Sequence, residues 1–329
     1  MKTGLKATIS IGAGLLAVFL AFVRMADAQP IPARVVWVSP TASGQGGPFF
    51  EELRRGLSEI GHVEGRSMRL ESVWGDGTPQ RAATLMAEVV ASSPDIIVTQ
   101  GSMGPLARKA TATIPVVFGY SGDPVEAGMV DSLPRPGRNM TGISYLTLEL
   151  VGKRMELLKE LLPKAKRIAV VASPDHPGDS SERRASQVAA ARLGIAIDYF
   201  ELGRGTTVAD VLASIEKARS DAVMFFPTQT VIANQARVAE WSLKTKVPTI
   251  SGWAQFADGG NIMSYGPNLA DASRRLAFYV DRILKGARAS DLPVELPSRV
   301  ELVVNQKTAR AIGVSVPPSV LLRADRVIE

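Results

Sequence analysis

Polar side chains, glycines and two aromatic rings follow the segments that the sequence marks as buried strands. In the first half of the chain they are Thr41, Ser43, Gly101, Ser102, Tyr120, Ser121 and Asp123, and in the second half they are Ser173, Thr228, Gln229 and Trp253. Ligands of parallel α/β sheets bind beyond the carboxyl ends of the strands, so we expect these residues to face one cleft. Several of these loops begin a helix, whose free N–H groups and dipole favour a carboxylate or another anion.

Individual roles follow from the chemistry of each side chain. Gly101 and Ser102 are the leading pair, because a glycine lets a ligand approach the backbone and a serine hydroxyl donates a hydrogen bond. Asp123 can accept from an amino group, while Tyr120 and Trp253 can wall an apolar or aromatic moiety. Structural roles are the alternative: hydroxyls cap helices, Asp123 can begin a helix, and the two rings can pack in a core. The predicted site therefore depends on the loops converging.

Residues that could perform catalysis are scarce. The chain has no cysteine, and its histidines are His62 and His176. It lacks a nucleophile-elbow pentapeptide, a Walker sequence and a dinucleotide fingerprint. We interpret His62 as a surface residue in a turn at the far end of the sheet. His176 follows a strand and can contact a ligand, or form a metal site with Asp175 and Asp179, which remains an alternative. We expect no catalytic activity, no cofactor and no metal.

Apolar runs and amphipathic stripes alternate along the chain and would position these loops. Strands are expected at residues 34–38, 68–73, 96–99 and 116–118, and again at 167–171, 196–200, 222–226 and 248–250. Helical stripes separate them, and a long one over 148–162 divides the two series. This alternation is typical of parallel sheets that are covered by helices on both faces.

The last part of the chain predicts that the two halves are interlinked. It contains a strand at 261–264, a helix at 269–283 and a strand at 300–304. We expect these elements to cross between the halves and form a hinge. The predicted fold is α/β, with two Rossmann-like lobes whose parallel sheets are joined by a multi-segment hinge. Lobe I comprises residues 29–144 and 266–295, and lobe II comprises residues 145–265 and 296–329.

Residues 1–28 have the pattern of a secretory signal peptide. Lys2 and Lys6 precede an uncharged apolar run at 7–23, and Ala26-Asp27-Ala28 supplies the small residues of a cleavage site. An uncleaved membrane anchor is the alternative, because the apolar run is barely long enough to span a bilayer. Without cysteine, the chain cannot be a lipoprotein. We therefore expect a soluble protein in the periplasm.

Composition and charge exclude other classes of protein. The apolar fraction of 46% and charged fraction of 21% are typical of soluble globular proteins. The net charge is +6, but basic and acidic residues are interleaved, so we expect no nucleic-acid partner. A mild positive balance favours the recruitment of anionic solutes.

A series of short motifs runs in order along nearly all of the mature chain. They are GHVEGR at 61–66, DIIV at 95–98, TIPVVF at 113–118, DPV at 123–125, RPGRNMTG at 135–142, MSYGP at 263–267, ILKGA at 283–287, DLPVE at 291–295 and ELVVN at 301–305. In this series the chain resembles the ABC transporter substrate-binding family that includes tryptophan- and tyrosine-type binding proteins, which have the type I periplasmic-binding-protein fold.

The resemblance implies a monomer that captures a small ligand between two lobes and delivers it to an ABC permease in the inner membrane. The ligand would be amino-acid-like or another small carboxylate, aromatic ones included. Members of the family often carry Gly-Thr where this chain has Gly101-Ser102, and the loop at residues 227–229 is more polar than its aromatic-rich counterpart. Two alternatives remain: a ligand-sensing subunit for a receptor kinase, and a secreted metal-dependent hydrolase.

Overall fold

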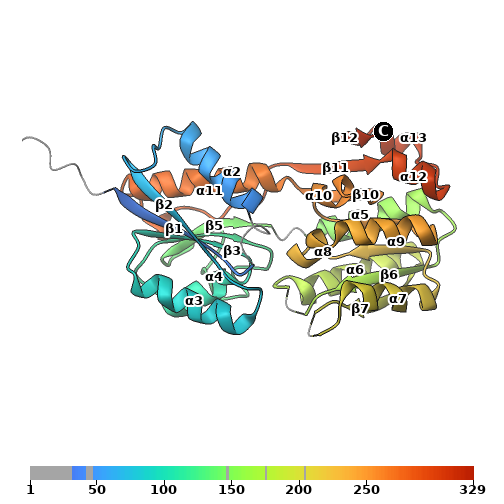
Figure 1. Cartoon of the computed structure of the whole chain (residues 1–329), viewed down its shortest axis with the longest axis horizontal. Helices are drawn as coiled ribbons and strands as arrows, with labels where there is room; N and C mark the ends of the chain where they lie inside the picture. Colours follow the sequence, from blue (N-terminus) through green and yellow to red (C-terminus); the bar gives the residue numbers. More distant parts are fainter. Residues whose placement is uncertain (1–31, 42–46, 146–147, 175, 204) are drawn as a thin grey trace, which may run out of the picture. The chain divides into compact units, whose positions relative to one another are not determined.

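The first run of strands forms a five-stranded sheet in the computed structural model, which describes residues 32–41, 47–145, 148–174, 176–203 and 205–329 (Figure 1). The strand order is β2-β1-β3-β4-β5. All its pairings are parallel. The strands are β1 (Ala33–Ser39), β2 (Met68–Trp74), β3 (Ile96–Gln100), β4 (Val116–Tyr120) and β5 (Met140–Ser144).

The remaining strands form a seven-stranded sheet in the order β12-β11-β10-β9-β8-β6-β7. They are β6 (Arg167–Ala172), β7 (Ala196–Glu201), β8 (Ala222–Phe225), β9 (Thr249–Ser251), β10 (Met263–Pro267), β11 (Val300–Asn305) and β12 (Arg326–Ile328). Its pairings are parallel except that β10 and β11 run antiparallel. The predicted α/β fold with two parallel-sheet lobes is therefore confirmed, with one antiparallel pair that the sequence pattern did not predict.

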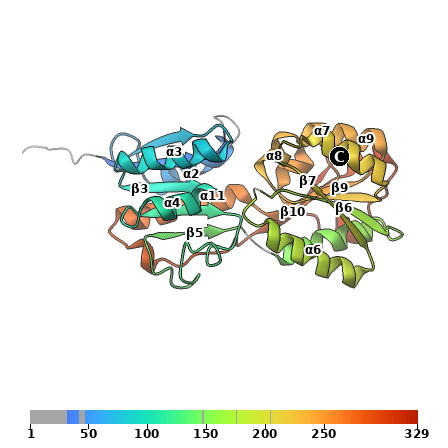
Figure 2. The same ribbon diagram turned by 90° about the horizontal axis from the view of Figure 1, so that it is seen from below.

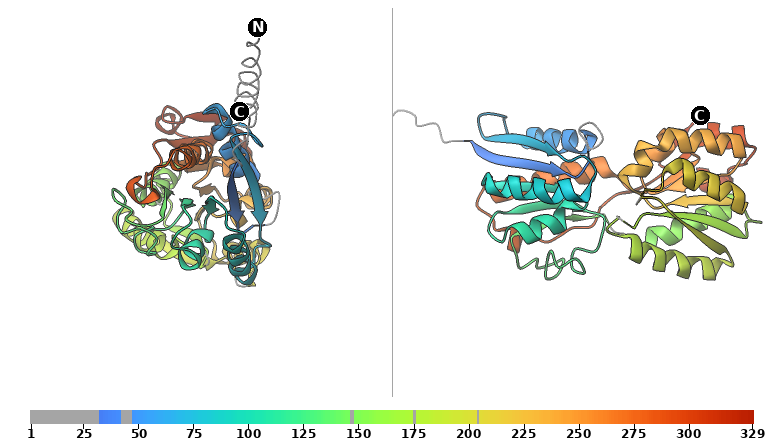
Figure 3. Two further views of the ribbon diagram at one scale, coloured as in Figure 1. Left: turned by 90° about the vertical axis from the view of Figure 1, so that its left-hand side faces the viewer. Right: turned by 60° about the horizontal axis from the view of Figure 1, so that its bottom comes forward.

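Helices cover both faces of each sheet (Figure 3). We call the first sheet with its helices lobe I, and the second sheet with its helices lobe II. Lobe I contains α2 (Gly47–Glu59), α3 (Pro79–Ala91), α4 (Met103–Ala110), α11 (Leu269–Leu284) and the short helix η1 (Ala289–Asp291). Lobe II contains α5 (Glu149–Leu161), α6 (Asp179–Leu193), α7 (Val208–Ala218), α8 (Gln229–Ala233), α9 (Gln235–Thr245), α10 (Ala254–Asp258), α12 (Gln306–Ile312) and α13 (Pro318–Leu321).

The strands of lobe I read as continuous apolar runs because their alternate side chains enter two different cores. Val35 and Trp37 of β1 pack with α2 and α11, whereas Val36 and Val38 pack with α3 and α4. Figure 2 shows α3 and α4 over the strands. Since successive side chains of a strand point to opposite faces, a sheet that is covered on both faces needs apolar residues at every position.

Helix α11 belongs to lobe I although it lies far along the chain. It packs against α2 and contacts β4 and β5 (Figure 1). His62, which we predicted to be a surface residue, is mostly buried there: its side chain is 12% exposed and its Nε2 lies 3.0 Å from Asp281 Oδ1. That prediction was wrong because α11 returns to cover the turn. The chain passes between the lobes after β5, after β10 and before β11.

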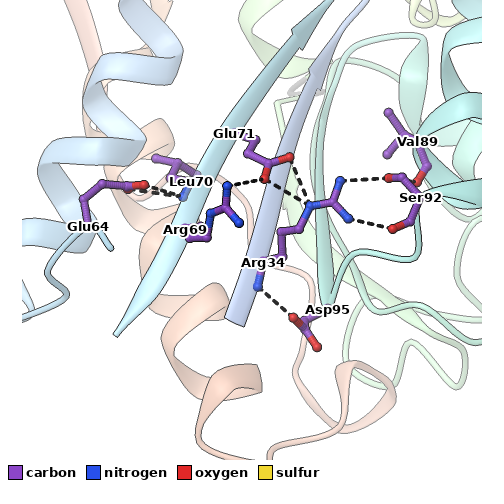
Figure 4. A network of polar contacts seen from close by, with 8 residues as sticks. All are labelled: Arg34, Glu64, Arg69, Leu70, Glu71, Val89, Ser92 and Asp95. Atoms are coloured by element: carbon purple, nitrogen blue, oxygen red, sulfur yellow. Dashed lines mark hydrogen bonds and ion pairs between the residues drawn. The ribbon is translucent and has the colours of Figure 1, made fainter. Parts of the chain in front are cut away.

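A polar network closes the amino ends of the strands in lobe I (Figure 4). Arg34 Nε donates to both carboxylate oxygens of Glu71 at 3.1 Å, and Arg34 Nη1 donates to the Ser92 carbonyl at 2.6 Å. The backbone N–H of Arg34 donates to Asp95 Oδ2 at 2.7 Å. These contacts join β1 to β2 and to the turn before β3. They therefore fix the amino end of β1 against its neighbours in the sheet.

The predicted signal peptide at residues 1–28 lies outside the described residues. Within the described part of the chain, no helix is both long enough and apolar enough to cross a membrane.

Strand β5 was not among the strands predicted from the sequence, and it ends at the predicted lobe boundary between residues 144 and 145. Gly142 at its centre resembles a strand breaker, but it has φ +149°, and a Cβ there would collide with the carbonyl oxygen of Phe118 on β4. Glycine is therefore required by the close approach of the two strands. Gly152 in α5 has room for a side chain, because a Cβ there would lie 3.7 Å from its nearest neighbours, which is an ordinary van der Waals distance.

This contrast predicts opposite effects for two matched substitutions. We expect Gly142→Ala to lower the free energy of unfolding by about 2–4 kcal/mol, through steric overlap and backbone strain. Gly152→Ala should raise it by about 0.5–1 kcal/mol, because alanine is the better helix former. Urea denaturation with an unchanged m-value measures both, and an unchanged midpoint for Gly142→Ala would contradict the β4–β5 packing.

Candidate functional site

A cavity of about 320 Å³ lies at the carboxyl ends of the strands and is lined by both lobes. Lobe I contributes Ser39, Pro40, Thr41, Phe49, Gly77, Gln100, Gly101, Ser102 and Ser121. Lobe II contributes Ser173, His176, Pro177, Thr228, Gln229, Thr230, Ala233, Asn234 and Trp253. We call this cavity the main pocket. Its volume lies at the lower end of the range for small-molecule sites.

Most of the residues predicted from the strand-end pattern meet in this pocket. They are Thr41, Gly101, Ser102, Ser121, Ser173, Thr228, Gln229 and Trp253. Ser43 lies outside the described residues. The loops that follow β1, β3, β4, β6, β8 and β9 therefore converge, and they do so because parallel strands bring their carboxyl ends to one edge.

Tyr120 and Asp123 lie elsewhere. Tyr120 is the last residue of β4, and its ring packs in the apolar core beneath α3 and α4 at 5% exposure. Burial there, with a smaller contribution from the charge of Asp123, raises the pKa of Tyr120 to about 12. Asp123 Oδ1 accepts from the backbone N–H groups of Val125 and Glu126, at 2.8 and 3.1 Å. Both residues thus have the structural roles that the sequence left open.

Several lining residues were not selected from the sequence. Ser39 and Gln100 follow the predicted strands at 34–38 and 96–99 but were not selected as ligand-binding residues, and the structure makes each the last residue of its strand. Phe49 belongs to the apolar face of α2 and contacts Trp253 edge-on, with ring centroids 6.3 Å apart. Asn234 comes from the junction between α8 and α9, which no sequence motif marks.

The lobe I wall presents hydrogen-bond donors to the pocket. Gly101 has φ +56°, and a Cβ placed on it would meet no atom within 4 Å, so the backbone there borders open space. Helix α4 begins at Met103 without a side-chain cap from Ser102. Its first N–H groups and the Ser102 hydroxyl are therefore suited to an oxygen atom of a ligand.

Helix α8 forms part of the lobe II wall. The Thr228 hydroxyl accepts from the N–H of Val231 at 3.2 Å and thereby caps this helix. A hydroxyl that accepts one bond still has its own hydrogen to donate. Gln229 and Asn234 add amide groups that can both donate and accept. The chemistry of this wall therefore suits a polar molecule with several oxygen or nitrogen atoms.

Formal charge reaches the pocket through one buried cluster in lobe II. His176 Nε2 lies 3.1 Å from Glu182 Oε2, and Arg154 Nη1 lies 3.7 Å from Glu182 Oε1. Arg154 Nε also donates to the carbonyl of Tyr265 at 2.8 Å. All three side chains are at most 6% exposed, and burial lowers the pKa of Arg154. Among the described lining residues of the main pocket, His176 is the one ionisable side chain.

The alternative of a metal centre finds no support in the described residues. No group of three or more histidine, aspartate or glutamate side chains there could hold a metal ion. The carboxylate of Asp179 is otherwise engaged, because Oδ1 accepts from the N–H of Ser173 at 3.0 Å and Oδ2 accepts from Arg183 at 2.8 Å. Asp175, the third residue of the proposed metal site, lies outside the described residues.

Comparison with known proteins gives one family and one fold. A family model described as "ABC transporter substrate binding protein" matches residues 49–328. A protein of Clostridioides difficile named "Tyrosine-binding protein" is 23% identical over 272 residues, which are 80% of this chain and 77% of that protein. The family match spans most of the chain.

Two solved structures are similar over nearly all of their own length. A conserved domain protein from Vibrio cholerae superimposes with a TM-score of 0.83 and 28% identity, covering 90% of this chain and 99% of that one. An ABC domain from Streptococcus pneumoniae in complex with L-Trp superimposes with a TM-score of 0.83 and 23% identity, covering 90% of this chain and 100% of that one.

The buried cluster predicts that replacing Glu182 lowers the free energy of unfolding far more than replacing Glu156. Glu182→Ala leaves the guanidinium of Arg154 buried without its partner and should lower the free energy of unfolding by about 3–5 kcal/mol. The double variant R154M/E182L should recover most of that loss, because two apolar side chains replace the charges. Glu156→Ala, which removes an exposed ion pair with Arg192, should change stability by about 1 kcal/mol or less. Urea denaturation that gives equal losses for Glu182→Ala and Glu156→Ala would contradict this account.

Proposed function

Because the chain belongs to the ABC transporter substrate-binding protein family, we propose that the main pocket is the place where it captures its ligand. The observation that carries this proposal is the convergence of hydroxyl, amide and backbone donors from both lobes on one cavity of about 320 Å³. We propose that Thr41, Ser43, Gly101, Ser102, Ser121, Ser173, Thr228, Gln229 and Trp253 bind the ligand. The position of Tyr120 and Asp123 outside the lining supports leaving them out of this set.

The ligand that we propose is amino-acid-like or another small carboxylate, aromatic ones included. Two relatives support this class: the C. difficile protein is named for tyrosine, and the S. pneumoniae structure contains L-Trp. The uncapped start of α4 and the Ser102 hydroxyl suit a carboxylate. The rings of Phe49 and Trp253 suit an apolar or aromatic portion of the same molecule.

We propose that the lobes open and close about the segments that cross between them. The predicted boundaries at residues 144–145 and 295–296 fall between elements, whereas the boundary at 265–266 falls inside β10. The pairing of β10 with β9 and β11 supports moving that crossing to Pro267. Closure would bury the ligand in the main pocket, beside the contacting rings of Phe49 of lobe I and Trp253 of lobe II.

Delivery to an ABC permease in the inner membrane completes the proposal, with the protein acting as a periplasmic monomer that performs no catalysis. The family assignment supports the transport role. Neither the receptor-kinase subunit nor the secreted hydrolase gains support from any contact of the described residues.

Ligand capture predicts stabilisation by the correct solute. L-tyrosine, L-tryptophan and small aromatic carboxylates are the first compounds to add in a thermal-shift screen. A ligand at 100 times its Kd should stabilise the folded protein by about 2.7 kcal/mol and raise Tm by several degrees. If no compound of a broad panel of amino acids and carboxylates moves Tm, the proposed ligand class is wrong.

The pocket assignment predicts weaker binding in two lining variants. Ser102→Ala and Thr228→Ala should each weaken the best compound of that screen by about 1–3 kcal/mol, because a buried polar group of the ligand loses its partner. Ser214→Ala on the exposed face of α7 is the matched control and should leave the affinity unchanged. Calorimetry that shows wild-type affinity in both lining variants would remove the main pocket from the proposal.

A further inference from the structure

A second, smaller cavity shares part of the lining of the main pocket. Ser121, His176 and Trp253 line both cavities, whereas Arg154 and Glu182 border the smaller one alone. Its volume is about 10 Å³, which is the space of one water-sized atom. A molecule held in the main pocket can therefore extend a single heavy atom into the smaller cavity, between residues of both lobes.

Two buried polar atoms at this cavity have no hydrogen-bond partner. They are Arg154 Nη1 and Glu182 Oε2, on residues that are 2% and 4% exposed. His176 Nε2 is close to that carboxylate oxygen, at 3.1 Å, but without the geometry of a hydrogen bond. Leaving a hydrogen-bonding atom of a buried charged group without such a partner is more unfavourable than leaving an atom of a neutral group without one. The site therefore calls for an atom that satisfies both groups.

The hydrogen-bonding character of Arg154 Nη1 and Glu182 Oε2 decides which ligand atom can occupy the smaller cavity. A guanidinium nitrogen only donates, and an ionised carboxylate oxygen only accepts. The occupant must accept from Arg154 and donate to Glu182 with one heavy atom. A carboxylate oxygen would face the negative charge of Glu182, an ammonium would face the positive charge of Arg154, and a methyl group would satisfy neither.

We infer that the smaller cavity is a subsite for a hydroxyl group of the ligand, whose place is taken by water when no ligand is bound. This inference rests on the proposed function, because the hydroxyl belongs to a molecule that occupies the main pocket. Trp253, Pro227 and Pro267 provide apolar walls around the subsite. Trp253 also lines the main pocket, where Phe49 contacts it, so the ring of a phenol can lie there while its hydroxyl enters the subsite. The preferred ligand is therefore a hydroxylated aromatic acid or amino acid rather than its unhydroxylated analogue.

Binding of matched pairs tests the inference. The pairs are L-tyrosine with L-phenylalanine, and 3-(4-hydroxyphenyl)propionate with 3-phenylpropionate, each measured by calorimetry on the full-length mature protein. We expect the hydroxylated member to bind roughly 10- to 100-fold more tightly, which is the range of a hydrogen bond to a charged group. Equal affinities within a pair would overturn the hydroxyl subsite and leave the proposed function intact.

Glu182→Gln separates the subsite from the rest of the pocket. The substitution keeps the size of the side chain and removes its charge. We expect it to reduce the preference for the hydroxylated member by about 10-fold, because the hydroxyl then donates to a neutral amide oxygen and not to a carboxylate. Glu156→Gln on the exposed side of α5 is the control and should retain the wild-type preference. A full preference in Glu182→Gln would overturn the assignment.

A crystal structure of the ligand-free protein supplies a readout that needs no ligand. We expect an ordered oxygen atom within hydrogen-bond distance of both Arg154 Nη1 and Glu182 Oε2. A cavity without that density, or one filled by a protein side chain, would overturn the subsite. If neither pair of compounds binds, the aromatic ligand class of the proposed function fails, and this crystal structure alone decides on the subsite.

Discussion

The packing of α11 against α2 is the contact on which the two-lobed arrangement depends. Gly56 of α2 lets the helices approach closely, because a Cβ there would lie 2.7 Å from the carbonyl oxygen of Arg274 and 2.9 Å from Ala277 Cβ. Arg274 also pairs with Glu52 at 2.9 Å. Since α11 follows β10 of lobe II and precedes β11 of the same lobe, this one contact obliges the chain to leave lobe II and return. The two lobes are therefore joined by several segments of the chain.

The same topology explains why the pocket is polar and carries little formal charge. Parallel strands place their carboxyl ends, and the helix starts that follow them, at one edge of each sheet. Hydroxyls, amides and backbone N–H groups are therefore the natural lining, as at Ser102 and Thr228. They can hold a ligand without the large desolvation penalty that a buried ion imposes. Such a lining suits reversible capture, in which the ligand must also be released.

The cluster of Arg154, Glu182 and His176 differs from the rest of the pocket region, because it contains ionisable side chains. Its side chains are nearly fully buried, and they line the smaller cavity together with Ser121 and Tyr145 of lobe I. Buried ion pairs add little stability compared with apolar side chains of similar size. The proposed hydroxyl subsite gives these side chains a role in recognition, through the two atoms that have no hydrogen-bond partner, Arg154 Nη1 and Glu182 Oε2.

The sequence by itself determined the fold class and most of the pocket, because both depend on local patterns. Apolar runs separated by amphipathic stripes predict a parallel sheet, and the residues after each strand then follow from strand polarity, as Gly101, Ser121 and Thr228 illustrate. Family motifs in series predicted the same two-lobed fold. These signals need no knowledge of which distant segments meet.

Only the tertiary structure decided which way individual side chains turn and which distant elements they meet. Tyr120 and Ser121 are adjacent, yet the ring of Tyr120 packs in the core and Ser121 lines the main pocket. The reason is that successive side chains at the end of a strand point to opposite sides. His62 is buried by α11, which joins lobe I from far along the chain. The cluster of Arg154, Glu182 and His176 likewise joins two helices and a loop, and no spacing in the sequence encodes such a meeting.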